Sequence, residues 1–247
     1  LVGSEMCIRD SYTSLYHTMI DPRCFSDCDG RYVGADKKIH QTEKFTYRTV
    51  FSGWDVFRSQ FPLQTLINPR LVNDEINSLI QIAQLSGKEY FPRWEVVNAY
   101  SGCMLGNPAI SVLADAYEKG IREYDVQKAV EYAANTQKQF GNGDLGYTPG
   151  SLSHTLEYAY TDWCLGQLMS SLGKKKEAAE HEKRAKAYRN VWCDSVQWFR
   201  ARVKSGGWLP WRGRTAQDQG TTESNPFQQG WFVPHAVSYT HLTLPTT

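Results

Sequence analysis

The stretch HTLEYAYTDWCLGQLMSSL (residues 154–172) predicts a long helix and decides the class of fold. Residues 174–192 follow it after a short link and form a second helical segment that alternates small and charged residues. Ala178 and Ala185 on this second segment suit close contact between two helices. We therefore expect the two segments to pack as an antiparallel helix hairpin.

The same helical spacing of apolar residues recurs outside this hairpin. It is found in residues 12–20, 51–67, 69–85, 109–119 and 124–140, which long polar connections separate. No fixed period of about 34 or 40 residues is present, which argues against tetratricopeptide and HEAT arrays. We expect an all-α fold of antiparallel helix hairpins whose long loops gather at one end around a pocket.

Composition favours a globular domain and excludes some classes of partner. Hydrophobic residues make up 41% of the 247 positions, which is enough for a buried core. The net charge of +1 gives no reason to expect nucleic acid or an anionic membrane as a partner. Eight Trp and fourteen Tyr suit either a core or carbohydrate recognition, because flat rings cover the apolar face of a sugar.

The two ends do not continue the patterns beside them. Residues 1–11 (LVGSEMCIRDS) and residues 237–247 (VSYTHLTLPTT) resemble translated sequencing-adapter read-through. We therefore set residues 1–11 and 236–247 aside as non-native ends and expect one partial domain over residues 12–235.

A polar and aromatic stretch near the C-terminal end is the first candidate for a functional loop. It reads TTESNPFQQGWFVPH over residues 221–235 and combines the carboxylate of Glu223 with amide groups and aromatic rings. Oxygen ligands at this density suit a hard cation such as Ca²⁺, and the rings suit a sugar face. The alternative is a turn-rich loop that enters a short helix, with Asn225 before Pro226 at the first helical position.

Two other places carry side chains of the kind that bind sugar hydroxyls. Asp27 and Asp29 flank one residue in a glycine-containing loop, where they could bind a ligand or form a solvated Asx-rich turn. Asp55 and Arg58 lie three positions apart on one predicted helix face. At the mouth of a pocket this pair would accept and donate hydrogen bonds to a sugar, whereas on an open surface it would contribute little.

Six blocks of this sequence together resemble family 92 of the glycoside hydrolases, which are calcium-dependent, exo-acting α-mannosidases. The blocks occur in the family's order over nearly all of residues 12–235. They are YTSLYHTM, FSDCDGRYVG, FSGWDVFRSQFPLQTL, CMLGNPAISVLADAYEKGI, TLEYAYTDWCLGQL and TESNPFQQGWFVPH. The resemblance implies an incomplete (α/α)6 barrel that is part of a catalytic domain, a mannose-containing glycan as substrate, Ca²⁺ as cofactor, and a periplasmic or secreted location.

The resemblance also implies roles for single residues. Family members invert the anomeric configuration with one carboxylic acid and one carboxylate that activates water, while calcium holds the mannose. The residues implied in substrate binding are Asp27, Asp29, Gly30, Trp54, Asp55, Arg58 and Glu223. The residues implied in calcium binding are Glu223, Asn225 and Gln228.

The sequence departs from the family's pattern at two positions. Where members that cleave mannose–mannose bonds carry a general-acid glutamate, residues 98–102 read NAYSG. Glu95 is then the nearest carboxyl group, and Tyr100 is the alternative proton donor, although a phenol with a pKa of about 10 is a poor acid. Thr222 replaces a histidine that accompanies preference for α-1,2 linkages, so the linkage stays open.

Three alternatives follow from these departures. A missing acid would be tolerated if the leaving group were a phosphate, so a mannosyl phosphodiester is an alternative substrate. A non-catalytic mannose-binding relative is a second alternative, and a helical scaffold for protein partners is a third that leaves the Trp-, Asp- and Glu-rich loops unexplained. The water-activating carboxylate is expected beyond residue 235, so the chain by itself is expected to release no mannose.

Overall fold

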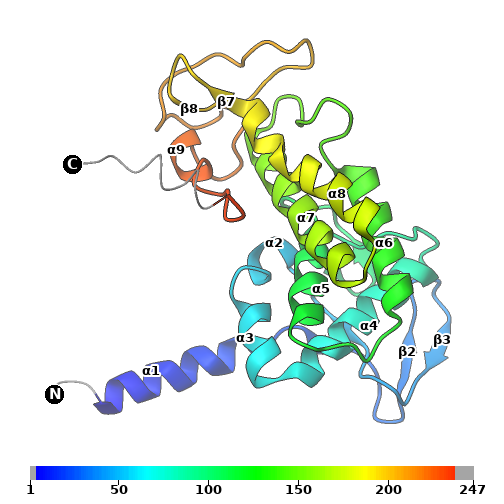
Figure 1. Cartoon of the computed structure of the whole chain (residues 1–247). Coiled ribbons are helices and arrows are strands. Elements are labelled where there is room, and N and C mark those ends of the chain that lie inside the picture. Colours follow the sequence, from blue (N-terminus) through cyan, green and yellow to red (C-terminus); the bar gives the residue numbers. More distant parts are fainter. Residues whose placement is uncertain (1–3, 237–247) are drawn as a thin grey trace.

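The computed structural model describes residues 4–236, and the expected non-native residues 237–247 lie outside this range. Helices dominate the described chain, and its strands form two-stranded antiparallel ladders in the connections between helices (Figure 1). The expectation of a helical fold is confirmed in this outline. No helix among residues 4–236 combines the length and the apolar character needed to cross a bilayer.

The helices and strands occur in a simple order along the chain. The helices are α1 (Ser4–His17), α2 (Gly53–Val56), α3 (Gln60–Ile67), α4 (Pro69–Leu85), α5 (Pro108–Glu118), α6 (Val126–Phe140), α7 (Leu152–Ser171), α8 (Lys175–Arg184), the 3₁₀ helix η1 (Ala185–Val191) and α9 (Pro226–Gln229). The strand pairs are β1 (Arg23–Cys24) with β4 (Arg48–Thr49), β2 (Arg31–Val33) with β3 (Ile39–Gln41), β5 (Glu95–Val96) with β6 (Ala99–Tyr100), and β7 (Trp192–Cys193) with β8 (Trp198–Phe199).

Helix α7 is the centre of the structure. It packs against α5, α6, α8 and η1, and most of its residues are buried (Figure 1). Gly166 lies against the backbone of α8 at Ala178 and Glu182, where a Cβ atom would already be in contact. The hairpin of α7 and α8 is therefore present as the sequence predicts, although η1 replaces the second half of the predicted second helix.

Two hydrophobic clusters lie along α7, the larger at its C-terminal half and the smaller at its N-terminal half. The larger one joins α3 to α8 and includes Phe61, Ile110 and Leu165. The smaller one gathers around Trp198 and holds the segment that carries α9. Phe232 packs against both clusters, so the segment after α9 is tied to the helical body.

The single helix expected over residues 51–67 is wrong, because this stretch folds as two helices with a break before α3. Pro62 explains the break. A continuous helix would require an N–H at this position and would place the proline ring against the preceding turn, whereas Pro62 is tolerated in the first turn of α3. Residues 31–41 form the β2–β3 hairpin, in which the Tyr32 ring stacks on Tyr47 and on His40.

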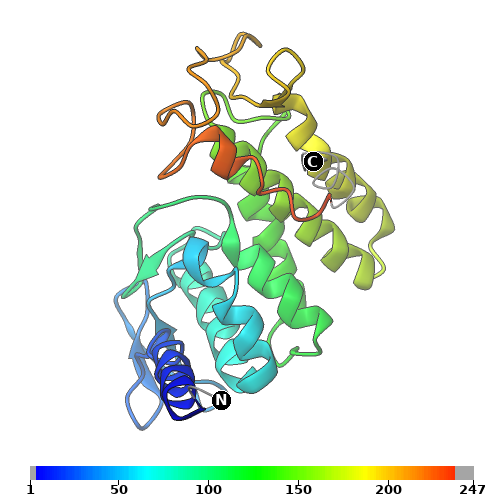
Figure 2. The ribbon, with the colours of Figure 1, turned by 90° about the vertical axis from the view of Figure 1, so that its left-hand side faces the viewer.

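Helix α1 buries none of its residues. Figure 2 shows it at the end of the molecule away from α9. The helix includes most of the segment that we set aside as non-native, and its assignment as non-native stays a prediction.

Two buried carboxyl groups, Glu75 on α4 and Glu95 on β5, lie near each other. Glu75 on α4 is 1% exposed, and its Oε2 atom has no hydrogen-bond partner. Burial, together with a smaller contribution from the nearby Glu95, raises the pKa of Glu75 to about 8, and the charge of Arg48 opposes this rise. Glu75 is therefore mostly protonated in the folded chain at neutral pH.

Replacement of Glu75 by glutamine should change how stability depends on pH. The folded state disfavours the ionised carboxyl, so its contribution to stability is full below the unfolded pKa of about 4.5 and declines as pH rises towards 8. At pH 7 this loss amounts to roughly 3 kcal/mol. Urea unfolding between pH 5 and pH 8 should show a shallower decline for Glu75→Gln than for the native chain. An unchanged slope, or an equal effect of Glu131→Gln on the exposed face of α6, would contradict this assignment.

Candidate active site

An open pocket of about 310 Å³ lies between α2, α7 and the segment around α9. Figures 1 and 2 both place α9 beside the N-terminal part of α7, above α2. The lining residues are Trp54, Arg58, Glu157, Thr222, Glu223, Ser224, Gln228, Gln229, Trp231 and Phe232. The volume falls within the range of pockets that hold small ligands.

The carboxylate of Glu157 forms the floor of the pocket. Its Oε1 atom accepts a hydrogen bond from Trp54 Nε1 at 2.8 Å and another from an Arg58 terminal nitrogen at 2.9 Å. Only 2% of the Glu157 side chain is exposed, compared with 36% for Arg58. Glu157 thus fixes two residues of the α2 region that precede it by 103 and 99 positions.

The guanidinium of Arg58 is held between aromatic rings. It lies 5.2 Å from the centre of the Trp54 ring, 4.7 Å from that of Phe57 and 4.6 Å from that of Phe232. Its Nε atom also donates to the carbonyl of Trp54 at 3.2 Å. Cation–π contacts of this kind restrict a flexible side chain to one orientation, so Arg58 presents a preorganised donor to the pocket.

The electrostatics of Glu157 favour a structural role. Burial raises the pKa of its carboxyl, while the charge of Arg58 and the hydrogen bonds from Trp54 and Arg58 oppose that rise. A buried carboxylate needs such partners, because an unpaired charge in this position would be very unfavourable. We assign Glu157 as a residue that positions Trp54 and Arg58.

The start of α7 also fixes the other wall of the pocket. The hydroxyl of Ser153 donates to Gln229 Oε1 at 2.7 Å and accepts from the backbone N–H of Thr222 at 3.0 Å. The backbone N–H groups of Leu152 and Ser153 donate to the carbonyl of Gly220. One helix therefore holds both the α2 wall and the α9 wall.

The segment 221–235 forms a loop followed by a short helix, as one of the two interpretations of the sequence expected. Asn225 and Gln228 make a capping box at the start of α9. Asn225 Oδ1 accepts from the N–H of Gln228 at 2.9 Å, and Gln228 Oε1 accepts from the N–H of Asn225 at 3.1 Å. Two of the three predicted calcium ligands, Asn225 and Gln228, thus have a structural task.

The oxygen atoms at this wall fit a hard cation in their chemistry. Glu223 carries an exposed carboxylate, and the amide oxygens of Asn225 and Gln228 each retain a second lone pair. The hydroxyl of Ser224 is shielded from solvent and has no hydrogen-bond partner among the described residues. Calcium prefers six to eight oxygen ligands, so these groups could supply only part of its shell. No group of three His, Cys, Asp or Glu side chains suited to a metal occurs within residues 4–236.

The structure brings together some of the predicted substrate-binding residues. Trp54, Arg58 and Glu223 all line the pocket. Asp55 does not line it, and its Oδ2 atom accepts a hydrogen bond from the Ser52 hydroxyl at 2.5 Å. The predicted pairing of Asp55 with Arg58 is replaced by the pairing of Arg58 with Glu157.

The predicted residues Asp27, Asp29 and Gly30 lie in the turn that leads into the β2–β3 hairpin. Asp29 forms an ion pair with Arg31 at 2.6 Å. Gly30 has a φ of 78°, and its carbonyl accepts a hydrogen bond from the backbone N–H of Thr42. Figure 1 shows this hairpin and α9 at opposite ends of the molecule. Within the described residues the turn contributes nothing to the pocket.

Glu95 and Tyr100, the two candidate proton donors, lie in the β5–β6 hairpin and do not line the pocket. Glu95 Oε1 accepts from the Thr49 hydroxyl and from the N–H of Asn98, and its Oε2 atom accepts from the N–H of Val50. The Tyr100 hydroxyl donates to the carbonyl of Tyr90 at 2.7 Å, and burial raises its pKa. Both groups therefore have structural partners, and their catalytic role stays a prediction.

Glu157, Gln229 and Trp231 line the pocket but were not predicted as site residues from the sequence. The available signal for Glu157 was a carboxylate within a mainly apolar helix, at a position that needs a buried partner. Its partners are about 100 positions away, so spacing along the sequence could not identify them.

Truncation of Glu157 should destabilise the chain more than truncation of an exposed acid. Glu157→Ala removes a buried carboxylate that accepts two hydrogen bonds and leaves Arg58, whose side chain is 36% exposed, without its partner; loss of such charge-assisted hydrogen bonds costs roughly 1.5–3 kcal/mol. Glu180→Ala on α8 is the matched control, because its pair with Arg184 is exposed and contributes at most about 1 kcal/mol. Urea denaturation at pH 7 measures both, and equal effects would show that the Glu157 network contributes little.

Comparison with known proteins gives consistent matches over this chain. The profile described as "Glycosyl hydrolase family 92 catalytic domain" matches residues 3–240. A family GH92 α-mannosidase from Bacteroides thetaiotaomicron superposes with a TM-score of 0.86 at 33% identity, covering 90% of this chain and 31% of that one. Its complex with mannoimidazole gives 0.83 at 32% identity, with coverage of 90% and 32%.

Two further proteins extend the comparison. A family GH92 inverting mannosidase from Bacteroides thetaiotaomicron superposes with a TM-score of 0.84 at 30% identity, covering 95% of this chain and 34% of that one. A curated uncharacterized secreted glycosidase from Arthroderma benhamiae is 28% identical over 181 residues, which is 54% of this chain and 24% of the relative. The chain thus spans about a third of these solved structures and about a quarter of the curated relative.

Proposed function

Because this chain belongs to glycosyl hydrolase family 92, we propose that it supplies part of the mannose-binding site of an exo-acting α-mannosidase. The hydrogen-bonded group of Trp54, Arg58 and Glu157 carries this proposal. It presents an aromatic ring and a fixed guanidinium at the floor of an open pocket, beside the carboxylate of Glu223. A terminal mannose is the substrate class that fits such a pocket and the mannosidase neighbours.

The described residues account for binding and orientation. Arg58 would donate to a mannose hydroxyl, Glu223 would accept from another, and the rings of Trp54, Trp231 and Phe232 would cover the apolar parts of the sugar. Glu157 would keep the first of these donors in place. The wider site would lie within an incomplete (α/α)6 barrel formed by residues 12–235.

The reaction that we propose is inverting hydrolysis on a secreted or periplasmic protein. It needs one carboxylic acid for the leaving group and one carboxylate for the attacking water. The partners that already occupy Glu95 and Glu157 favour other carboxyl groups for these two tasks. The neighbour described as an inverting mannosidase supports this stereochemistry for the present chain.

One observation favours a second candidate substrate. Residues 98–102 contain no carboxyl group, and the nearest one, Glu95, is buried with three hydrogen bonds. A phosphate leaving group departs without protonation by an acid, so a mannosyl phosphodiester would remain cleavable. A mannose-binding relative without turnover is consistent with the same observation.

The pocket should bind mannoimidazole, the ligand of one solved neighbour, through Arg58. We expect Arg58→Ala to weaken binding at least tenfold, because a charge-assisted hydrogen bond contributes about 1.5–3 kcal/mol. Arg184→Ala on the exposed face of α8 is the control and should change affinity less than twofold. Isothermal titration calorimetry measures the affinity of the native chain and of the two variants for mannoimidazole. Equal affinity of the native chain and Arg58→Ala would reject this pocket as the mannose site.

Calcium should bind at the α9 wall through Glu223. When bound, the ion would supply positive charge that holds sugar hydroxyls, while Asn225 and Gln228 orient the carboxylate loop. We expect Glu223→Gln to weaken calcium affinity at least tenfold without shifting thermal unfolding in a chelator. Glu177→Gln on the exposed surface of α8 should have no effect on affinity. Calcium binding that is unchanged by Glu223→Gln would place the ion elsewhere.

A further inference from the structure

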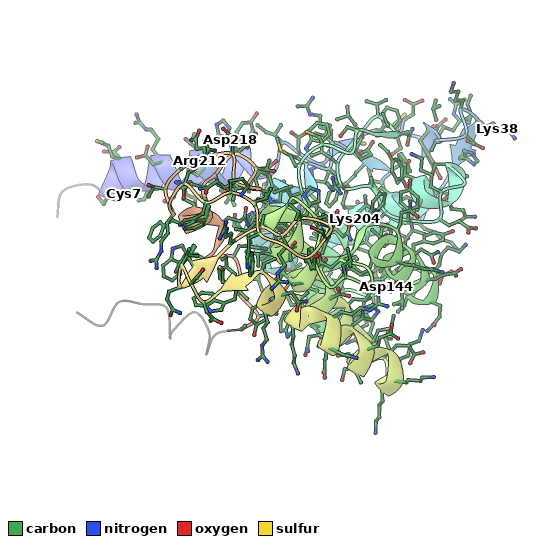
Figure 3. All side chains as sticks on the ribbon, turned by 90° about the horizontal axis from the view of Figure 1, so that it is seen from above. Cys7, Lys38, Asp144, Lys204, Arg212 and Asp218 are labelled. Atoms are coloured by element: carbon green, nitrogen blue, oxygen red, sulfur yellow. The ribbon has the colours of Figure 1, made fainter. Side chains whose placement is uncertain are left out.

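A polar groove lies away from the candidate active site, along α4. It consists of two adjoining cavities of about 520 and 700 Å³ that share Lys44, Arg122 and Glu123, and we call it the α4 groove. Its walls are α4, the β2–β3 hairpin with the residues after it, and the 120–125 link. Figure 3 shows Lys38 in the hairpin at the opposite end of the molecule from Arg212 and Asp218, which precede α9.

Positive charge is in excess at the smaller cavity. Lys44 and Arg70 are exposed there and form no ion pair with any described residue. Arg122 lies 4.1 Å from the centre of the Tyr117 ring and donates through Nε to the carbonyl of Tyr117, which leaves its terminal nitrogens available. Of the acids at this cavity, Asp74 is already paired with Arg48, so only Glu123 opposes the three cations. An anionic group is the complement of this arrangement.

Two shielded polar atoms at the groove have no partner among residues 4–236. They are the amide oxygen of Asn73, a residue that is 6% exposed, and the hydroxyl of Tyr124. Asn73 lines the smaller cavity, and Tyr124 lines the larger one. A buried polar group without a hydrogen bond is unfavourable, so a ligand that carries hydroxyls would satisfy both.

The aromatic residue of the hairpin does not offer a free face. The Tyr32 ring stacks on Tyr47 at 4.1 Å and on His40 at 5.7 Å between ring centres. A ligand in the groove would therefore meet the edge of Tyr32, and recognition by stacking is not available from this ring. Charge and hydrogen bonds are left as the means of recognition.

From these contacts we propose that the α4 groove binds a phosphorylated sugar. The phosphate group lies among Lys44, Arg70 and Arg122, and the sugar hydroxyls reach Asn73 and Tyr124. Each cavity is far larger than a free phosphate requires, and both have the volume of pockets that hold small organic ligands. The proposal goes beyond the mannosidase function and uses none of the residues of the candidate active site.

Calorimetric titration of this chain with glucose 6-phosphate, mannose 6-phosphate and inorganic phosphate at low ionic strength tests the proposal. The double variant Lys44→Glu/Arg70→Glu should weaken binding of both sugar phosphates at least tenfold. The double variant Lys175→Glu/Lys204→Glu makes the same charge change at exposed positions elsewhere and should alter binding less than twofold.

A second variant separates the sugar from the phosphate. Tyr124→Phe should weaken both sugar phosphates at least threefold and leave inorganic phosphate unaffected, because it removes only the unpartnered hydroxyl. Circular dichroism confirms that each variant is folded. Arg58→Ala should leave glucose 6-phosphate binding intact, so a failure of the mannosidase proposal would not be mistaken for a failure of this one.

Three results would overturn the proposal. They are the absence of sugar phosphate binding by the native chain, unchanged binding by Lys44→Glu/Arg70→Glu, and binding of inorganic phosphate as tight as that of the sugar phosphates. The last result would show that the α4 groove binds free phosphate and does not recognise the sugar.

Discussion

The rest of the pocket depends on the buried contact between Glu157 and the pair formed by Trp54 and Arg58. Removing a carboxylate and a guanidinium from water is unfavourable, and their attraction offsets that cost only when geometry is good and the remaining hydrogen bonds are made. Here one carboxylate oxygen accepts two hydrogen bonds, and three aromatic rings surround the guanidinium. Such a contact adds little stability relative to a well-packed apolar one, but loss of one partner is unfavourable and only one arrangement satisfies both. It thereby fixes the α2 region on α7.

Helix α7 extends this constraint to the opposite wall. Its first turn uses the Ser153 hydroxyl to hold both Thr222 and Gln229, so the carboxylate of Glu223 is carried on a segment attached to the same rigid element as Arg58. A binding site that must match its ligand within about half an ångström benefits from supports that share one helix. The fully buried Leu152, Leu156 and Leu165 and the close approach of Gly166 to α8 keep that helix in place.

Features with local causes could be predicted from the sequence, and features with distant causes could not. Helix α4 has the predicted bounds because Asn68 caps it and Pro69 occupies its first position. The start of α9 follows from Asn225 and Pro226 for the same reason. The resemblance to family 92 located Trp54, Arg58 and Glu223, all of which line the pocket. It could not reveal that Arg58 pairs with Glu157 instead of Asp55, because that choice is made by tertiary packing across about 100 residues. The break before α3 could have been predicted from Pro62, but the helical spacing of apolar residues over 51–67 favoured one continuous helix instead.

The two predicted proton donors lie in the β5–β6 hairpin, outside the pocket that is proposed to bind the sugar. Val97 and Asn98 both have positive φ angles, a tight turn that is unfavourable for a β-branched residue such as Val97. Glu95 stabilises this turn by accepting from the N–H of Asn98, while Thr49 and Val50 occupy the rest of its carboxylate. For the Glu95 carboxyl to donate a proton to a substrate, the turn would have to open and release these hydrogen bonds. In the proposed hydrolysis of a mannoside, an acid from another segment would take the place predicted for Glu95, whereas a phosphate leaving group would need no acid.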